Sequence, residues 1–431
     1  MTTSEIIATL DKWNFWNQKI DTGFRRALYL EKLNKLLNMS EVVALIGVRR
    51  SGKSTLILQL IEELIAKGTA PQNTLYINFE EPNFSDDLSV KFLVKIFDAY
   101  LEFFDPKGKV FLFLDEAQLV KGWERFVAAL HDRKANVKIF VTGSSAKLLR
   151  SEISTLLGGR YVSEIIYPLS FAEFLDFKKE FRQPANLPLI KNPKLYNYLR
   201  EYAEFGGFPK VVIEKENYGK KTLLVEYFNS ILERDILFRH RIKNEKDIKE
   251  IASFSMANVA SQISTYKIEK DFGISSPNAR RYFGYFEESF LLQFVPFFSY
   301  SVKKQIYNPQ KVFSIDTGLR NAVSFKFSED IGKLLENIVL LEFLRKKEEP
   351  YYWEGKAEID FVLRRGHEVS QLVNVCYLLN GKSLAREIKS LEEGMAEFKN
   401  AKAKIIYWEG EPPKHKKIEF VNILDFLLDK K

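Results

Sequence analysis

Along the first part of the chain, short apolar runs alternate with segments whose apolar residues recur at the spacing of an amphipathic helix. Strands that are apolar throughout and separated by helices are typical of a parallel sheet covered on both faces. An α/β fold is therefore predicted here. We expect strands at 42–46, 74–79, 110–114, 137–142 and 164–167, and helices at 55–67, 88–104 and 123–131.

The sequence on either side of this region has a helical pattern. Residues 1–40 are rich in charge, and the four leucines at 30, 33, 36 and 37 share one helical face. From 169 to about 235 the pattern is again helical, with many aromatic residues. We expect these segments to be helical.

A helix-turn-helix is predicted after residue 244. Helices at 267–272 and 277–292 flank a turn at Gly273-Ile-Ser275, and Ser275 or Ser276 is expected to cap the second helix. Apolar stretches that would supply the strands of a wing lie at 291–297 and 305–315. This order predicts a winged helix-turn-helix domain.

The last part of the chain predicts a second α/β unit. A helix is expected at 331–347, and apolar runs of strand length follow it. These runs lie near 351–353, 358–363, 371–377 and 404–407.

Composition narrows the class of protein. A length of 431 residues predicts about two to four domains. The single cysteine, Cys376, excludes an internal disulfide and favours a reducing compartment. No apolar run approaches the ~18 residues that span a bilayer, and the first residues lack a signal-peptide pattern. We therefore expect a cytoplasmic protein without membrane contact.

Residues 47–54 read Gly-Val-Arg-Arg-Ser-Gly-Lys-Ser, which fits the phosphate-binding pattern G-x-x-x-x-G-K-[ST] between a predicted strand and helix. Backbone N–H groups in such a loop converge on phosphate beside a positive helix N-terminus. Lys53 is expected to reach the β- and γ-phosphates of ATP, and Ser54 to offer its hydroxyl to Mg²⁺. The predicted nucleotide-binding residues are Gly47, Arg50, Ser51, Gly52, Lys53, Ser54 and Thr55.

Asp115 and Glu116 directly follow the apolar run 110–114. Asp115 is expected to face the same sheet edge as Gly47 and to hold Mg²⁺ through a water, while Glu116 orients and deprotonates the attacking water. A carboxylate directly after the metal-binding Asp marks P-loop ATPases with an extra strand between the loop strand and the metal strand. The strand at 137–142 is predicted to be that strand. The sequence therefore predicts Mg²⁺-dependent ATP hydrolysis.

Two further residues are candidates for catalysis. After the fourth strand, Ser144 is favoured over Thr142 and Ser145 for reading the γ-phosphate, with a plain helix cap as the alternative. Arg160 is a candidate arginine finger, in cis or from a neighbouring subunit, with a solvated arginine as the alternative. Ion pairs are expected to join Arg49 or Arg50 to Glu80 or Glu81.

Taken jointly, these motifs resemble those of a prokaryotic, largely archaeal, family of AAA-type P-loop ATPases with a C-terminal domain of uncharacterised function. The resemblance covers nearly the whole chain from about residue 20. It implies an AAA-like core at 1–168, a helical lid at 169–240, a winged-helix domain at 241–318 and a nuclease-like α/β domain at 319–431. Besides the phosphate loop, the matching motifs are Leu114–Gln118, Thr142–Ser145, Gly159-Arg160, Tyr167–Phe171, Glu201–Pro209 and Ile315–Leu319.

The nuclease-like domain is not expected to cleave. Nucleases of the restriction-endonuclease fold hold metal with a helical Glu, a strand Asp and an acid-x-Lys pair on the next strand. Here that next strand carries Asn374 and Cys376 in place of the acid and the lysine. We therefore predict a retained fold without nuclease activity. The remaining polar candidates are Glu336 or Glu342 on a helix, Glu358 and Asp360 on one strand face, and the possible substitutes Glu387 and Lys389.

DNA is the predicted partner. The net charge of +8 favours an acidic partner, and the second helix of the helix-turn-helix carries Asn278, Arg280 and Arg281 for contacts in the major groove. Four aromatic residues between Tyr282 and Phe286 favour the alternative that this helix packs internally. We expect an ATPase that binds duplex, forked or junction DNA and couples hydrolysis to DNA remodelling, with homo-oligomers possible. The alternative is a regulatory nucleotide switch that acts on a protein partner.

Overall fold

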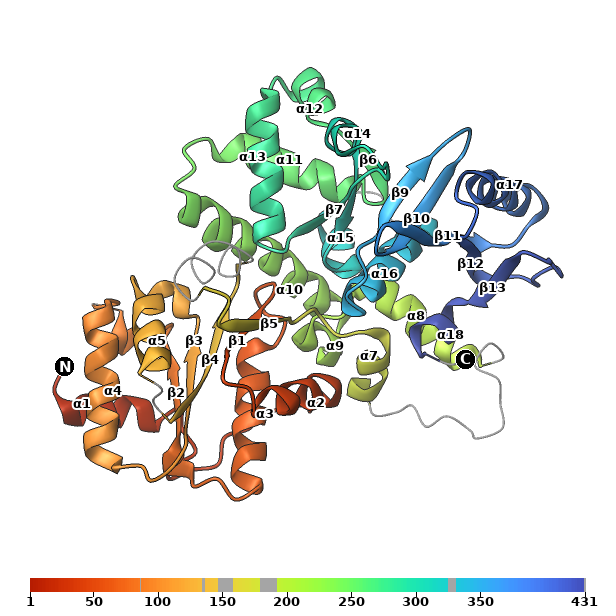
Figure 1. Cartoon of the computed structure of the whole chain (residues 1–431). Coiled ribbons are helices and arrows are strands. Elements are labelled where there is room, and N and C mark those ends of the chain that lie inside the picture. The colour runs from red at the N-terminus through yellow and green to blue at the C-terminus, as the bar shows by residue number, and fades with distance from the viewer. Residues whose placement is uncertain (86, 134–135, 146–157, 179–191, 325–330, 430–431) are drawn as a thin grey trace. The chain divides into compact units, whose positions relative to one another are not determined.

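The computed structural model describes residues 1–85, 87–133, 136–145, 158–178, 192–324 and 331–429. The chain forms two compact units, Met1–Ile166 and Tyr167–Lys431 (Figure 1). The finer division predicted at 240 and 318 stays a prediction. Within the described residues, no helix is long and apolar enough to cross a membrane.

The first unit is built on a parallel sheet with the strand order β2-β3-β4-β1-β5. β4 pairs with β1 on one side and β3 on the other, which confirms the parallel α/β core and the extra strand between loop strand and Asp115 strand. The fifth strand begins three residues earlier than expected, because a half-buried edge strand tolerates polar residues such as Ser163. The strands are β1 (Val42–Ile46), β2 (Thr74–Asn78), β3 (Val110–Asp115), β4 (Val137–Gly143) and β5 (Tyr161–Ile165).

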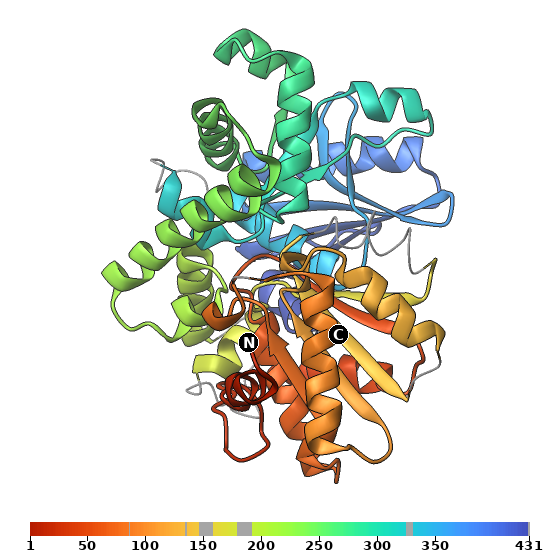
Figure 2. The same cartoon turned by 90° about the vertical axis from the view of Figure 1, so that its left-hand side faces the viewer.

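Helices cover both faces of this sheet (Figure 1; Figure 2 views the unit from the α4 side). α2 (Ala27–Leu36) and α3 (Lys53–Ala66) pack on one face, where Leu30, Leu33 and Leu60 contact the strand residues Val43 and Phe113. All five residues of β1 are buried, which is why its sequence is apolar throughout. The other helices are α1 (Thr3–Asp11), α4 (Val90–Phe104) and α5 (Trp123–Asp132), with 3₁₀ turns at Pro71–Asn73, Pro82–Phe84 and Ala117–Leu119.

Residues after α1 close the β2 edge of the sheet. The Asn14 side chain accepts the Tyr76 N–H at 2.8 Å and donates to the Tyr76 carbonyl at 2.9 Å. The Trp16 indole N–H donates to the Thr74 carbonyl at 2.8 Å. These side chains thus pair with an edge strand that would otherwise be open to another chain.

Three of the motifs that carry the family resemblance meet at the start of the second unit. They are Tyr167–Phe171, Glu201–Pro209 and Ile315–Leu319. The Leu169 N–H donates to the Gly207 carbonyl, and the Gly207 N–H donates to Asp316 Oδ2, both at 2.7 Å. A Cβ on Gly318 would lie 2.1 Å from the Phe205 carbonyl oxygen. The two segments can therefore approach this closely only because residue 318 is glycine. The surrounding helices are α7 (Phe171–Lys178), α8 (Pro193–Phe205), α9 (Pro209–Ile213), α10 (Asn217–Ser230), the π-helical stretch Ile231–Phe238 and α15 (Thr317–Val323).

The region predicted as a helix-turn-helix contains the two expected helices and a small antiparallel sheet in the order β6-β8-β7. Ser275 is the residue at the N-cap of the second helix. The stretch predicted to supply a strand at 305–315 contains β8, but its first residues, up to Tyr307, belong to a helix that begins at a Ser301 cap. The elements are α11 (Glu245–Ala257), β6 (Ser261–Ile263), α12 (Thr265–Phe272), α13 (Ser276–Glu288), β7 (Leu292–Val295), α14 (Val302–Tyr307) and β8 (Gln310–Ser314).

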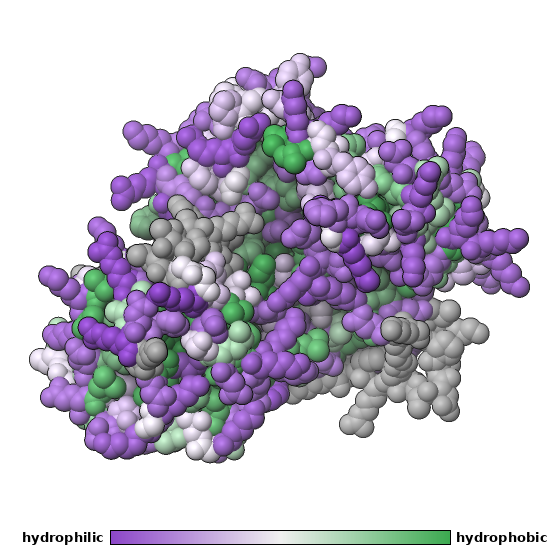
Figure 3. Space-filling model, in the orientation of Figure 1, coloured by the Kyte–Doolittle hydropathy of each residue, from purple (hydrophilic) through white to green (hydrophobic). Residues whose placement is uncertain are grey.

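Hydrophilic residues predominate on the face of the molecule shown in Figure 3. The short helix α14 departs from this composition, since Val302, Ile306 and Tyr307 are exposed along it. It also carries the exposed cations Lys303 and Lys304. This helix is therefore both basic and apolar at its surface.

The predicted second α/β unit is present as a mixed sheet in the order β13-β12-β11-β10-β9. β9, β10 and β11 pair antiparallel, and β11, β12 and β13 pair parallel. Leu391 on the long helix α17 packs into the core with Ile359, Leu372 and Ile405. The elements are α16 (Ile331–Arg345), β9 (Tyr351–Glu354), β10 (Glu358–Arg365), β11 (Glu368–Leu378), α17 (Gly381–Glu397), β12 (Lys402–Glu409), β13 (Ile418–Asn422) and α18 (Ile423–Leu427).

Candidate functional site

The predicted phosphate loop joins the end of β1 to the start of α3. At Gly47, with φ 152°, an added Cβ would lie 2.2 Å from the Ile166 carbonyl oxygen, so only glycine fits. Arg50 and Gly52 adopt positive φ values of 67° and 94°. No side chain caps α3, so its first N–H groups remain available to an anion. The loop therefore has the backbone that phosphate binding requires.

The Lys53 side chain is buried inside the loop. Its Nζ donates to the carbonyl oxygens of Gly47 at 3.0 Å and Val48 at 3.1 Å. These two carbonyls hold the ammonium inside the loop, where its charge also acts on the Glu116 carboxylate. Lys53 is thus placed to neutralise phosphate at the mouth of the loop.

Hydroxyl groups hold both oxygens of Asp115. The Thr142 hydroxyl donates to Oδ1, and the Tyr76 hydroxyl donates to Oδ2 at 2.7 Å. Tyr76 also hydrogen-bonds to Ser54, and burial together with the Asp115 charge raises the pKa of Tyr76 well above its ordinary value. The hydroxyl therefore stays protonated. The structure brings the two predicted Mg²⁺ ligands, Ser54 and Asp115, together around one tyrosine.

Glu116 adopts a left-handed backbone, with φ 54°, directly after β3. Its N–H donates to Thr142 Oγ1 at 2.8 Å, and its carboxylate accepts a hydrogen bond from Gln118 Nε2. Burial raises the pKa of Glu116, against the opposing charge of Lys53. Glu116 thus combines a strained backbone, an oriented carboxylate and an increased affinity for a proton. Such a residue is suited to deprotonating water.

Arg160 lies at the amino-terminal ends of the parallel strands, whereas the phosphate loop lies at their carboxyl ends. Its carbonyl accepts the N–H of Val42 at the start of β1, and its guanidinium pairs with Asp132. The five residues of β1 separate this edge from Gly47 by about 16 Å. This distance argues against the cis alternative for the arginine finger, and the trans alternative stays a prediction. Because β5 runs parallel to β1, the residue that precedes β5 must lie at the amino-terminal edge.

The polar residues at the end of β4 have separate surroundings. Thr142 holds Asp115 and the Glu116 amide. Ser144 is fully buried two residues further on, and its role in reading phosphate stays a prediction. Arg49 pairs with Glu80 at 2.8 Å, as expected, while Glu81 accepts the Trp13 indole N–H at 2.8 Å.

Sequence reasoning missed two residues that support the site. One is Tyr76, which hydrogen-bonds to Asp115 and Ser54. The other is Arg26, which contacts the phosphate loop from outside it. Arg26 is buried, its Nη1 donates to the Ser51 carbonyl at 2.9 Å, and its guanidinium lies 4.5 Å from the centre of the Tyr29 ring. A tyrosine in a strand and an arginine before a helix carry no local signal. Only the folded chain reveals their contacts.

We expect Tyr76→Phe to raise the Mg²⁺ concentration for half-maximal ATP hydrolysis by about tenfold, because a hydrogen bond to a charged carboxylate is worth about 1.5–3 kcal/mol. Titrating Mg²⁺ at saturating ATP measures this. The control is Tyr100→Phe, a buried tyrosine on α4 whose hydroxyl donates to the Gln72 carbonyl. Equal Mg²⁺ dependence in the two variants would show that Tyr76 does not position Asp115.

The candidate DNA-binding helix α13 has two distinct faces. Tyr282, Phe283 and Phe286 are buried, as the internal-packing alternative expects. Arg280 and Arg281 are exposed on the other side, where Arg281 Nη2 donates to Asn278 Oδ1 at 2.9 Å. The aromatic residues therefore anchor the helix without covering its arginines.

The carboxylates of the C-terminal domain gather around Lys311 on β8, with Glu336, Glu358 and Asp360 each within 3.3 Å of its Nζ. Glu336 and Glu342 were the two alternatives for the helical glutamate of a nuclease-like site, and Glu336 is the one that lies at this cluster. Glu342 instead pairs with Arg345 at 3.3 Å. The substitutes Glu387 and Lys389 line the adjoining cavity.

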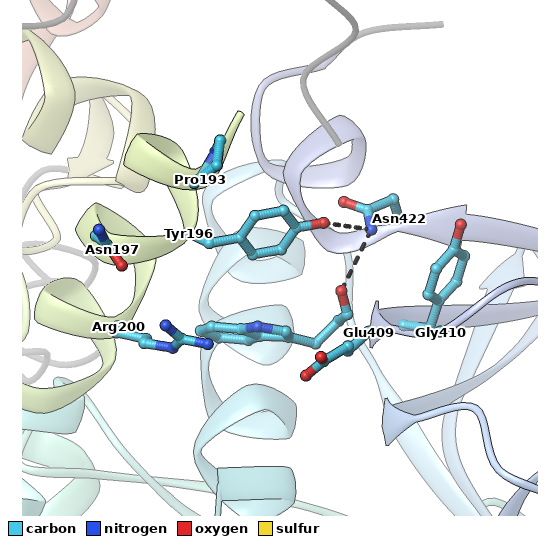
Figure 4. A pocket seen from close by; sticks show the side chains of 9 residues that line it. Pro193, Tyr196, Asn197, Arg200, Glu409, Gly410 and Asn422 are labelled. Carbon is cyan, nitrogen blue, oxygen red and sulfur yellow. Dashed lines mark hydrogen bonds between the residues drawn. The ribbon is translucent and has the colours of Figure 1, made fainter. Parts of the chain in front are cut away.

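A pocket of about 400 Å³ lies between α8 and the C-terminal sheet (Figure 4). The Tyr196 hydroxyl accepts a hydrogen bond from Asn422 Nδ2 at 2.9 Å, and Arg200 lines the same pocket. None of the residues predicted from the sequence to bind nucleotide, metal or DNA lines it. This pocket is separate from the predicted sites.

Two families match successive parts of the chain. Residues 39–175 match the family described as AAA domain, and residues 196–330 match a domain of unknown function, DUF8612. The first match spans the phosphate loop and both strand-end carboxylates. It supports chemistry of the ATPase type and nucleotide binding at this site.

Similar proteins extend over most of the chain. The uncharacterised protein MJ1544 of Methanocaldococcus jannaschii is 35% identical over 384 residues, which cover 86% of this chain and 83% of that protein. An uncharacterised protein of Haemophilus influenzae is 33% identical over 350 residues, covering 80% and 84%. Among solved structures, replication initiator DnaA bound to AMPPCP and single-stranded DNA is 20% identical with a TM-score of 0.30, covering 64% of this chain and 92% of that chain. The chain carries an AAA domain and belongs to the protein family of MJ1544.

Proposed function

We propose that the protein is a Mg²⁺-dependent ATP hydrolase. The observation that carries this proposal is the arrangement of Ser54, Asp115 and Glu116 around the hydroxyls of Tyr76 and Thr142, at the sheet edge where the phosphate loop opens. A hydroxyl and a carboxylate, with phosphate oxygens and water completing the shell, suit Mg²⁺. Bound there, the ion would neutralise charge on the phosphates.

The residues of the chain have separate tasks in this reaction. Lys53 binds the phosphates and balances their charge. Glu116 accepts a proton from the attacking water, and the Thr142 and Gln118 hydrogen bonds keep its backbone and carboxylate oriented. Two hydroxyl donors hold Asp115 in place as an anionic ligand for the metal. Ser144, at the end of β4, is proposed to contact the γ-phosphate.

An arginine-finger role for Arg160 requires a second copy of the chain, because its own phosphate loop is at the opposite sheet edge. We therefore propose this role only within a homo-oligomer. Gel filtration with and without a non-hydrolysable ATP analogue measures whether nucleotide recruits a second copy.

We further propose that residues 241–318 form a winged helix-turn-helix that binds DNA, beside a C-terminal domain that keeps a nuclease-like fold without cleaving. Support comes from the succession of α12, turn, α13 and antiparallel sheet. Arg280 and Arg281 are exposed on α13, and Lys303 and Lys304 are exposed on α14. Clustered exposed cations on such a module are the electrostatic footprint of phosphate binding.

Duplex, forked and four-way-junction DNA binding, measured across a salt series, tests this role. We expect Arg280→Ala/Arg281→Ala to weaken binding about tenfold and to lower the salt slope by about two, because each phosphate contact releases roughly one counter-ion. The matched control is Lys246→Ala/Lys249→Ala, which removes two cations from α11, one exposed and one half-buried. A wild-type protein without salt-dependent DNA binding would reject the DNA role and leave the nucleotide switch acting on a protein.

A further inference from the structure

A buried lysine occupies the middle of the C-terminal carboxylates. Lys311 is 1% exposed, and its Nζ lies 2.6 Å from Glu358, 3.1 Å from Asp360 and 3.3 Å from Glu336. Glu336 belongs to α16, and the other two belong to β10. We call these three side chains the carboxylate cage. They enclose a cation that comes from β8, outside the predicted nuclease-like domain.

The ammonium has no hydrogen-bonding capacity to spare. Its three N–H donors face three carboxylates, which is all that a lysine can satisfy. Burial lowers the pKa of Lys311, but the three carboxylates outweigh it and the pKa is raised above its ordinary value. Lys311 is therefore a permanent cation.

The cage carries more negative charge than this lysine balances. Burial and the neighbouring Asp360 raise the pKa of Glu336 to about 8, even with Lys311 in contact. A carboxyl shifts this far when further ionisation nearby is unfavourable. Even beside Lys311, the cage therefore disfavours ionisation of Glu336.

The remaining polar contacts at the cage are already formed. Asp360 Oδ2 accepts the Val375 N–H at 2.9 Å. Asn374, which stands where a nuclease would have an acid, donates to Glu387 and to Ser390 at 2.7 Å each. Within the part of the chain that the structure describes, no group of three or more His, Cys, Asp or Glu is arranged to hold a metal ion.

We propose that the Lys311 ammonium takes the place of a divalent cation in the carboxylate cage and keeps metal ions out. Mg²⁺ would need these oxygens at about 2.0–2.1 Å, so it and the ammonium exclude each other. Without the lysine, three carboxylates would converge on an empty centre, a donor set that suits Mg²⁺ or Mn²⁺. The same contacts join the β6-β8-β7 sheet to the C-terminal sheet. Lys311 thus occupies the position that a metal ion has in a cleaving enzyme. Its contacts there link the two sheets.

Mn²⁺ binding to the full chain without nucleotide tests this substitution. We expect Lys311→Ala to bind about one more Mn²⁺ than wild type, at least about tenfold more tightly, and to melt at higher temperature with Mn²⁺ than with EDTA. Adding Asp360→Asn should remove that site. Lys356→Ala is the matched control, because Lys356 is exposed and lines the adjoining cavity. The wild type and all of these variants keep the phosphate loop, so weak Mn²⁺ binding there is the same background in each measurement.

Two results would overturn the proposal. One is wild-type Mn²⁺ binding as tight as that of Lys311→Ala and lost on Asp360→Asn. The other is a folded Lys311→Ala that binds no more Mn²⁺ than wild type. If Lys311→Ala does not fold, Lys311→Ala/Glu358→Gln carries the same comparison, because Glu358→Gln removes one of the carboxylates left without the ammonium.

Discussion

Glu116→Gln should lower kcat for ATP hydrolysis by about 10²–10³-fold, because general-base catalysis contributes effects of that size and the amide cannot accept the proton of water. ATP binding should change little, since the amide keeps the size of the side chain and Lys53 is untouched. Steady-state phosphate release and ATP titration of the same preparations measure both quantities.

The matched control for this variant is Glu102→Gln, which makes the same chemical change at an exposed position on α4. Its kcat should equal that of wild type. A Glu116→Gln protein that turns over ATP at the wild-type rate would remove Glu116 from the reaction and return the role of base to another group.

Lys53→Ala should weaken ATP binding by about 100-fold or more. The Lys53 ammonium is buried and held only a few ångströms from the loop carbonyls, where its charge is poorly screened and faces the phosphates directly. Alanine suits the start of α3 and should leave the fold intact. Calorimetric titration with Mg-ATP measures the loss.

Lys67→Ala is the control for Lys53→Ala, because Lys67 follows the other end of α3 and pairs with Glu63 at 2.8 Å. It removes the same charge from the neighbourhood of the same helix. Comparable ATP affinity in Lys53→Ala and Lys67→Ala would mean that the loop does not bind phosphate through this lysine.

The parallel strands could be predicted closely because they are buried on both faces. β1 begins and ends at the predicted residues, and β3 and β4 extend one residue further. Two of the edge strands, β5 and β13, gave weaker signals. β5 has the adjacent polar residues Ser163 and Glu164 in its middle and was misplaced, and β13, which has the exposed Glu419, was not predicted at all.

The candidate nucleotide site was predictable where its residues are neighbours in sequence. Lys53, Ser54, Asp115 and Glu116 belong to two short motifs at strand ends, and strand order alone brings the motifs together. The supporting contacts join distant segments. Tyr76 reaches Asp115 across 39 positions of the chain, and no periodicity marks it.

Two long-range arrangements could not be read from the sequence. The cis and trans alternatives for Arg160 stayed open because distance along a chain says nothing about which end of a sheet a residue occupies. Lys311 lies on a strand within the predicted wing stretch, but its side chain crosses to carboxylates of another sheet. Such contacts are set by tertiary packing rather than by local sequence.

Phosphate release from ATP by the purified wild-type protein, measured with Mg²⁺ and with EDTA, tests the central claim most directly. We expect turnover that requires Mg²⁺ and is abolished in Lys53→Ala. Turnover that persists in EDTA and in Lys53→Ala, or tight ATP binding with no turnover under any condition, would contradict it.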